Sequence, residues 1–184
     1  GRLLVNKDHV GKYVNSPTSL IYEKHNELFG LFQAKQAISK KSMCYLVEGQ
    51  MDVIQLVQSG IDNVVASGGT ALTTNQIRLI HRFTENITLL YDGDKAGIKA
   101  AIRGIDMMLE EGLNVRVILL PEGEDPDSFA RKLNASDLQT YLDSNTQDFI
   151  RFKTQLLSED AQNDPTKRSE MILQIVNSIA VIPD

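Results

Sequence analysis

The stretch "NITLLYDGDKAG", residues 86–97, contains the pattern that decides the fold: an apolar run followed by two aspartates that one glycine separates. The run is rich in apolar side chains, which is typical of a strand buried on both faces of a sheet. Gly93 allows a tight turn directly after it. Asp92 and Asp94 therefore stand at the carboxyl end of a predicted strand.

Three more apolar runs resemble this one, and segments with helical spacing separate them. The four predicted strands cover 43–48, 63–67, 86–92 and 114–120. The helices predicted between them cover 51–60, 73–86 and 95–112. Gly60 and Gly112 stand where helices commonly end, and Thr73 or Thr74 stands where one commonly begins. This alternation predicts an α/β fold with a mainly parallel central sheet and helices on both faces.

The segments on either side of this region have a different pattern. Upstream, apolar residues are compatible with a helix that packs on the sheet, namely Leu28, Phe29, Leu31, Phe32 and Ala34. Downstream of residues 121–129 the pattern is helical only. We predict a basic N-terminal segment that joins the core, the α/β domain and the start of an all-helical subdomain, at 1–41, 42–144 and 145–184. The last helix keeps an apolar face without a partner, so we expect a longer protein.

Composition places the chain among ordinary globular proteins. It has 184 residues, of which 42% are hydrophobic. No apolar run approaches the roughly 20 residues of a membrane helix, and the N-terminus lacks the apolar core of a signal peptide. We therefore expect a cytoplasmic protein with no membrane partner. The single cysteine, Cys44, excludes an internal disulfide and a multi-cysteine zinc site.

Charge is unevenly distributed along the chain. Residues 1–41 contain seven Lys or Arg and three Asp or Glu, a net charge of +4. Because the whole chain has a net charge of −5, the remainder carries −9. A protein that binds a polyanion next to an acidic metal site has this asymmetry, although two solvated faces would also produce it.

Three acidic motifs follow predicted strands: "VEGQMD" at 47–52, "YDGD" at 91–94 and "PEGEDPD" at 121–127. The carboxyl ends of parallel strands meet at one edge of a sheet, where ligands bind. Carboxylates that converge there repel one another unless a cation lies among them. Mg²⁺ and Mn²⁺ prefer oxygen ligands and bind phosphates, so the pattern indicates metal-assisted phosphoryl transfer.

Each motif taken alone has another interpretation. A lone Asp-Gly-Asp is more often a turn or a helix cap, and the preference reverses only because three motifs occur together. A calcium-binding hand needs glutamate at the twelfth position of its loop, where this chain has Arg103. The glycine-rich "ASGGTALT" at 66–73 is either a tight turn or a source of amides for a phosphate. It lacks the lysine of a nucleoside-triphosphate P-loop.

In this order the motifs resemble the TOPRIM domain, the metal-binding α/β module of primases, topoisomerases and some nucleases. The resemblance is closest to the bacterial replicative primase family of the DnaG type. It rests on "KYVNSPTS" (12–19), "EGQMD" (48–52), "ASGGTALT" (66–73), "YDGDKAG" (91–97) and "PEGEDPD" (121–127), and it covers about residues 1–133. Gln50 replaces the usual tyrosine, and Gly68 and Gly69 replace a leucine-glycine pair. None of these departures falls on a proposed metal ligand.

The resemblance implies a DNA-directed RNA polymerase that makes short RNA primers on single-stranded DNA. Its substrates would be ribonucleoside triphosphates, and its cofactor Mg²⁺ or Mn²⁺. Catalytic roles are implied for Glu48, Asp92 and Asp94. The implied metal ligands are Glu48, Asp52, Asp92, Asp94, Asp125 and Asp127. The implied contacts to template or nucleotide are Arg2, Lys12, Tyr13, Asn15 and Lys24.

Primases of this family also carry an N-terminal zinc-binding module and a C-terminal domain that binds the replicative helicase. The 184 residues contain neither, so zinc and the helicase are expected only through those parts. We expect the isolated chain to bind metal weakly and to be inactive alone. Two alternatives stay open: a TOPRIM nuclease or topoisomerase, and a non-catalytic phosphate-binding α/β module. "KYVNSP" together with "EDPD" favours the primase.

Overall fold

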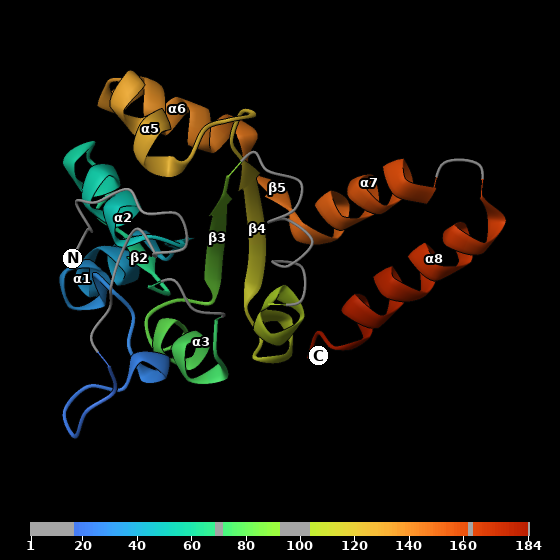
Figure 1. Ribbon diagram of the computed structural model, residues 1–184, viewed down its shortest axis with the longest axis horizontal. Coiled ribbons are helices and arrows are strands. Elements are labelled where there is room, and N and C mark those ends of the chain that lie inside the picture. Colours follow the sequence, from blue (N-terminus) through green and yellow to red (C-terminus); the bar gives the residue numbers. More distant parts are fainter. Residues whose placement is uncertain (1–16, 69–71, 93–103, 162–163, 184) are drawn as a thin grey trace, which may run out of the picture.

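The computed structural model describes residues 17–68, 72–92, 104–161 and 164–183, and its centre is a five-stranded sheet (Figure 1). The strand order is β2-β1-β3-β4-β5. The first four strands are parallel, and β5 pairs antiparallel with β4. The strands are β1 (Cys44–Val47), β2 (Val64–Ala66), β3 (Asn86–Tyr91), β4 (Asn114–Leu119) and β5 (Gln147–Asp148). The predicted α/β fold with a mainly parallel sheet is confirmed.

Helices connect and follow the strands. The N-terminal part contains the 3₁₀-helix η1 (Lys24–Asn26), α1 (Leu31–Lys41), α2 (Gln50–Gln58) and α3 (Thr74–His81). A further helical segment covers 104–110. The C-terminal part contains α5 (Pro126–Lys132), α6 (Ala135–Asn145), α7 (Phe149–Ala161) and α8 (Pro165–Ala180). Within the described ranges, no helix combines the length and the apolar character needed to cross a membrane.

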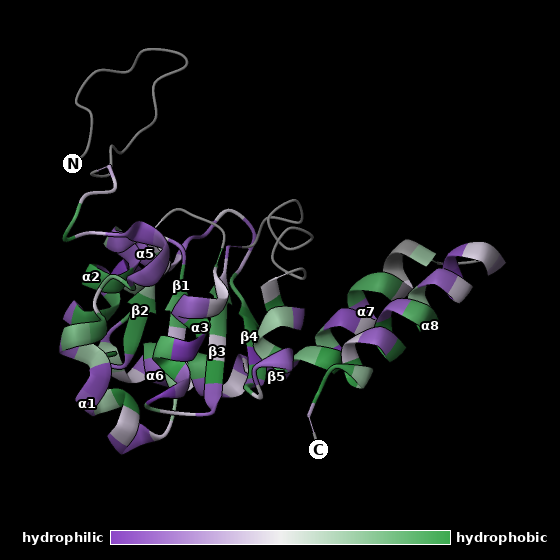
Figure 2. Ribbon diagram, turned by 90° about the horizontal axis from the view of Figure 1, so that it is seen from below, coloured by the Kyte–Doolittle hydropathy of each residue, from purple (hydrophilic) through white to green (hydrophobic). Residues whose placement is uncertain are grey.

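Both faces of the sheet are buried, because alternate side chains of each strand point to opposite faces. In β1, Cys44 and Leu46 belong to a core with residues of α1, α3, 104–110 and α7. Tyr45 and Val47 belong to a second core with residues of α2, α5 and α6. Figure 2 shows the apolar strands inside the body of the fold, from which the pair α7 and α8 projects. Helices on both faces were predicted and are confirmed.

The predicted helix ends are confirmed at three positions. Gly60 and Gly112 adopt positive φ angles of 94° and 79° after their helices. The Thr73 side chain accepts a hydrogen bond from the Gln76 backbone N–H, and Gln76 Oε1 accepts one from the Thr73 N–H. This reciprocal capping box begins α3. The same Gln76 is buried, and its Nε2 donates to the carbonyl of Glu27 at 2.7 Å, which holds the segment after η1 against α3.

The helix predicted upstream of β1 begins later than its apolar residues suggest. Phe29 exchanges two backbone hydrogen bonds with Ala66 at 2.9 and 3.0 Å, so it extends the sheet edge instead of entering the helix. Gly30 then adopts a φ of 86°, and α1 starts at Leu31. Leu28 and Ala34 are buried as predicted, whereas Phe32 is 77% exposed, so its predicted packing on the sheet is wrong.

The C-terminal part differs from the prediction in one respect. Residues 145–184 were expected to be helical only, but β5 pairs with β4 before α7 begins. Asp148 Oδ1 then accepts hydrogen bonds from the N–H groups of Ile150 and Arg151, which satisfies the first turn of α7. α6 contributes Leu138 and Leu142 to the core under the sheet. The predicted boundary near residue 144 stays a prediction.

We expect Gly30→Ala to lower the free energy of unfolding by about 1–3 kcal/mol, because alanine resists a left-handed backbone. A Cβ at Gly30 would also stand 3.0 Å from Val53 Cγ1 and 3.3 Å from the Val64 carbonyl oxygen. Urea denaturation of the chain measures the change. Gly104→Ala is the control, because a Cβ there meets no atom within 4 Å and φ is not positive. Equal stability of the two variants would contradict the conformational constraint.

Candidate functional site

Parallel pairing brings the first two acidic motifs together at one sheet edge. Leu46 of β1 pairs with Leu89 of β3. Two residues further along each strand, this register sets Glu48 beside Tyr91, the last residue of β3. Burial, and next the negative charge of Glu48, raise the pKa of the Tyr91 phenol. Glu48 itself is exposed, and so is Asp92, which follows Tyr91.

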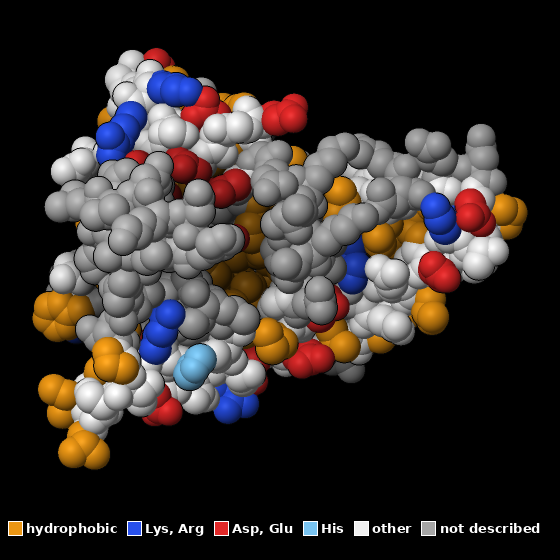
Figure 3. Space-filling model, viewed as in Figure 1, with side chains coloured by type: hydrophobic (Ala, Val, Ile, Leu, Met, Phe, Trp, Pro, Cys, Tyr) orange, Lys and Arg blue, Asp and Glu red, His pale blue; other side chains and the backbone are white. Residues whose placement is uncertain are grey.

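The third motif reaches the same edge through β4. Tyr91 pairs with Leu119, and the Tyr91 carbonyl accepts a hydrogen bond from the Leu120 N–H at 3.1 Å. The chain then turns and enters α5, which packs against α2. Figure 3 shows acidic side chains grouped next to α5. The described residues of all three acidic motifs therefore lie at the carboxyl end of the sheet, as the sequence predicts.

Asp52 lies in the first turn of α2, close to the start of α5. Its Oδ2 accepts a hydrogen bond from the Gly49 N–H at 2.9 Å. Burial is the largest of the effects that together raise the pKa of Asp52 to about 6; the charges of Asp125 and Asp92 act in the same direction, and the Gly49 hydrogen bond and the nearby Asp127 backbone act against them. Asp52 is therefore close enough to Asp92 and to Asp125 to be repelled by both.

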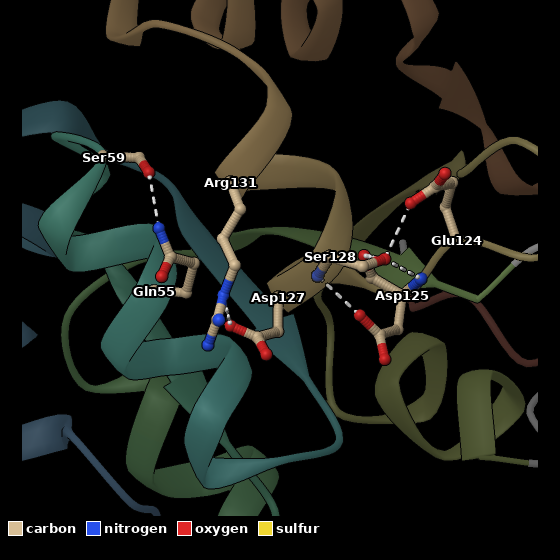
Figure 4. Close-up of polar contacts among 7 residues, drawn as sticks. All are labelled: Gln55, Ser59, Glu124, Asp125, Asp127, Ser128 and Arg131. Atoms are coloured by element: carbon tan, nitrogen blue, oxygen red, sulfur yellow. Dashed lines mark hydrogen bonds and ion pairs between the residues drawn. The ribbon is translucent and has the colours of Figure 1, made fainter.

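Asp125 and Asp127 each make a contact within α5 (Figure 4). Asp125 Oδ1 accepts a hydrogen bond from the Ser128 N–H at 2.6 Å and caps the helix. Asp127 Oδ1 forms an ion pair with Arg131 Nε at 2.9 Å. A carboxylate offers about four lone-pair positions on two oxygens. A cap or an ion pair therefore leaves room for a metal bond.

The negative charge of Glu124 is compensated by residues of α5. Its carboxylate forms an ion pair with Lys132 and accepts a hydrogen bond from Ser128 Oγ at 2.7 Å. These two contacts, the lysine first, lower its pKa. Glu124 is therefore stable as an anion without a further cation, whereas burial and two acidic neighbours raise the pKa of Asp52.

The donor set fits a hard divalent cation. Carboxylates that approach at a partly buried sheet edge destabilise one another, and a cation with oxygen preference relieves that repulsion. Within the described ranges, no three acidic, histidine or cysteine side chains enclose a metal position by themselves. Asp94 lies outside the described residues. Ligation by Glu48, Asp52, Asp92, Asp94, Asp125 and Asp127 stays a prediction.

Most of the residues predicted to contact template or nucleotide lie outside the described residues, namely Arg2, Lys12, Tyr13 and Asn15. Lys24 is described and is half-buried in η1. Thr73 Oγ1 donates to the His25 carbonyl at 2.6 Å, and Asn75 Nδ2 donates to Asn26 Oδ1 at 2.7 Å. These bonds fix η1 against the start of α3. Lys24 therefore has a defined place in the fold, while its contact stays a prediction.

Two features of the site are not apparent from the sequence. Tyr91, the last residue of β3, lies beside Glu48 at the edge of the site. Asp52, predicted as one more acid of the site, also caps α2 through the Gly49 N–H. An acid three residues after a helix start is a capping signal, so this bond was predictable. The position of Tyr91 beside Glu48 depends on the register between β1 and β3.

We expect Asp52→Asn to stabilise the chain at neutral pH when no divalent cation is present. The pKa of Asp52 is raised from its ordinary value near 3.8 to about 6, so the folded state binds this proton more tightly than the unfolded state. The carboxylate charge therefore lowers the free energy of unfolding above pH 6, and this effect disappears as the pH falls below about 4. Asparagine carries no charge, so we expect the free energy of unfolding to rise by about 1–2 kcal/mol at pH 7.5 after allowance for partial exposure.

Chemical denaturation at pH 7.5 and pH 4 measures this difference. Asp62→Asn is a control with the opposite sign, because the hydrogen bond from Lys41 lowers the pKa of Asp62. On this exposed pair we expect a loss of at most about 1 kcal/mol at pH 7.5. A destabilised Asp52→Asn at pH 7.5 would contradict the proposed repulsion.

Comparison with known proteins gives the same family as the motifs. Residues 45–130 match the "Toprim-like" family model. The DNA primase of Aquifex aeolicus is 44% identical over 144 residues, which cover 78% of this chain and 29% of that protein. The DNA primase of Clostridium acetobutylicum is 39% identical over 183 residues, 99% of this chain and 29% of that protein. The chain thus spans less than a third of the length of these relatives.

Solved structures agree with the sequence comparison. A DNA primase domain from Pseudomonas aeruginosa superposes with a TM-score of 0.87 at 34% identity, over 100% of this chain and 58% of that one. A structure of the DnaG catalytic core superposes with a TM-score of 0.84 at 33% identity, over 100% of this chain and 59% of that one. By sequence and by fold, this chain belongs to the DnaG-type DNA primase family, and it corresponds to the TOPRIM-containing part of the catalytic core.

Proposed function

We propose that this chain is the metal-binding part of a DNA-directed RNA polymerase that synthesises primers on single-stranded DNA. The observation that carries the proposal is the convergence of three acidic motifs at one edge of a primase-like sheet, with Asp52 raised to a pKa of about 6 by burial and by its acidic neighbours. A DnaG primase catalytic domain bound to single-stranded DNA is 33% identical and superposes with a TM-score of 0.84. That likeness supports the same template for this chain.

In this proposal the acidic residues have two roles, metal binding and helix capping. We assign Glu48, Asp92 and Asp94 as ligands of Mg²⁺ or Mn²⁺, and Asp125 and Asp127 as further ligands. A bound divalent cation would supply Lewis acidity, which favours a 3′-hydroxyl nucleophile and balances charge on the nucleoside triphosphate. Asp52 caps the start of α2 through the Gly49 N–H and faces Asp125 at the start of α5. The family implies use of a divalent metal ion, and both ions suit this oxygen donor set.

The basic N-terminal segment would bind the phosphates of template and nucleotide. A metal site balances only part of the charge on a nucleic acid and a triphosphate, so a polymerase also needs cations along the phosphate path. The excess of +4 over residues 1–41 supplies them in an otherwise acidic chain. We assign template or nucleotide contacts to Arg2, Lys12, Tyr13, Asn15 and Lys24. We assign the contacts to a replicative helicase and to zinc to other parts of the primase. The primase would act in the cytoplasm.

A TOPRIM nuclease or topoisomerase would share the acidic edge of the sheet. A "Toprim-like" match over 45–130 alone does not separate these enzymes from a primase. Similarity to primases extends over 99% of the chain and so includes the basic N-terminal segment and α7 and α8. This extent favours primer synthesis.

We expect Asp92→Asn, and likewise Asp94→Asn, to reduce Mn²⁺-dependent primer synthesis by about 100-fold or more, because a metal ligand is lost at the reacting phosphate. Incorporation of labelled nucleotides on a single-stranded template measures it in the intact primase that contains this chain. The matched control is Glu110→Gln, which neutralises an exposed carboxylate on the helical segment 104–110. Full activity of both aspartate variants would overturn the metal assignment, and cleavage in place of extension would favour the nuclease.

Metal binding is expected to raise the melting temperature of the chain with increasing Mn²⁺. A cation that binds only the folded state stabilises it by RT ln(1 + [M]/Kd), about 2.7 kcal/mol at one hundred times Kd. Glu48→Gln and Asp92→Asn should each flatten this dependence, whereas Glu110→Gln should leave it unchanged. A melting temperature independent of Mn²⁺ in the unaltered chain would favour the non-catalytic phosphate-binding module.

A further inference from the structure

A buried lysine joins the C-terminal helices to the α/β body. Among the side chains that the structure describes, Lys153 of α7 is the one charged residue that is buried. Its Nζ donates to Ser178 Oγ of α8 at 2.5 Å and lies 3.7 Å from Asp106 Oδ1. The Ser178 hydroxyl in turn donates to Asp106 Oδ1 at 2.6 Å. We call Lys153, Ser178 and Asp106 the Lys153 network.

The network connects three helices at a particular place. Asp106 lies on the helical segment 104–110, which follows Asp92 and the residues after it in the chain. Ile105 and Met108 of the same segment are buried in the core against the sheet. Figure 1 shows the C-terminal end of α8 returning to this segment. The network therefore links α7 and α8 to the helix that leads away from the second acidic motif.

The other contacts of α7 and α8 with the core are largely apolar, apart from the pairing of β5 with β4 at the start of α7. α7 contributes Phe149 and Phe152 to the core, and Val181 after α8 packs against the same cluster. Apolar contacts tolerate small rotations and shifts, whereas charge-assisted hydrogen bonds require defined distances and angles. The Lys153 ammonium also lies 5.7 Å from the centroid of the Phe149 ring, within reach of a cation–π contact. The network therefore adds directional side-chain bonds where α7 and α8 meet the helical segment 104–110.

A buried ammonium is a poor way to gain stability. Its removal from water costs free energy that an apolar side chain of similar volume avoids, and such replacements are often neutral or stabilising. A buried polar group can instead select one arrangement among several that pack equally well. The side chain of Asp106 is 38% exposed, so it stays solvated if the lysine is removed. Lys153→Met therefore tests orientation with little risk to folding.

We propose that Lys153 is a positioning residue, and that the Lys153 network sets the direction of α7 and α8 relative to the helix that follows the acidic motif at Asp92. The effect of the network on primer synthesis rests on the function proposed above, whereas its effect on the orientation of the helices is independent of that function. The two effects are measured in separate experiments.

Orientation is measured as the distance distribution between spin labels at Ser136→Cys on α6 and Gln174→Cys on α8, both of which are exposed positions. The native Cys44 is fully buried and does not compete for label. In the 184-residue chain we expect Lys153→Met to broaden or shift the distribution while the melting temperature stays equal or rises. Lys167→Met, the same change at an exposed lysine of α8, should leave the distribution narrow. An unchanged distribution for Lys153→Met would overturn the proposal.

Ser178→Ala provides a second, smaller change that removes only the bridging hydroxyl. It should broaden the distribution as Lys153→Met does, so the proposal remains testable if either variant folds poorly. A narrow distribution in the folded Ser178→Ala chain would also overturn it.

In the intact primase, Lys153→Met and Ser178→Ala should lower kcat for primer extension by about tenfold or more, because misplacement of a remote element disturbs the reacting geometry. KM for nucleotide and the Mn²⁺ concentration for half-maximal activity should not change, and Lys167→Met should behave as the unaltered enzyme. A raised KM or an altered Mn²⁺ dependence would overturn the positioning role, and so would unchanged kcat alongside a broadened distribution. If the aspartate variants disproved the primase, the label distances would still report on the network.

Discussion

Parallel pairing of β1, β3 and β4 is the constraint on which the acidic site depends. Because these strands run in one direction, their carboxyl ends coincide, and the residues that follow each end must share one edge of the sheet. The register between Leu46 and Leu89 places Glu48 beside Tyr91, and the register between Tyr91 and Leu119 brings the turn before Asp125 to the same edge. The charges of Asp125 and Asp92 add to burial, the main cause, in raising the pKa of Asp52. The direction and register of the strands thus gather the acids at one edge of the sheet, and this arrangement favours a bound cation.

Asp52 shows how a structural and a chemical role share one carboxylate. The hydrogen bond from the Gly49 N–H stabilises its anion, while burial and the charges of Asp125 and Asp92 destabilise it. The destabilising effects are larger, since the pKa rises. Asp62 shows the reverse, because the hydrogen bond from Lys41 is the main influence on it and lowers its pKa. The cap that begins α2 therefore also holds Asp52 close to the other acids.

The sequence predicted those parts of the fold that local patterns control. Four buried strands were recognised from apolar runs, and the ends of helices from Gly60, Thr73 and Gly112, because capping depends on neighbours in the chain. Two elements depend on distant partners and were missed. The start of α1 is delayed because Phe29 pairs with Ala66, and β5 exists only because β4 is next to it. For the site, residue type and strand order were enough to bring Glu48, Asp52, Asp92 and Asp125 to one edge. They were not enough to find the Lys153 network, since one lysine in an amphipathic helix has the pattern of a solvated residue.

The helical segment 104–110 comes after β3 and Asp92 in the chain, and its residue Asp106 belongs to the Lys153 network. α8 leaves large apolar side chains exposed on its other side, among them Ile172, Leu173, Val176 and Ile179. Within the described residues those side chains contribute little to fixing the helix. The direction of α8 then depends on its packing against α7, on Val181 and on the Lys153 network, while the pairing of β5 with β4 fixes the start of α7. A change at Lys153 therefore acts on the side-chain bonds that join both C-terminal helices to the helical segment 104–110, and through that segment to the α/β body.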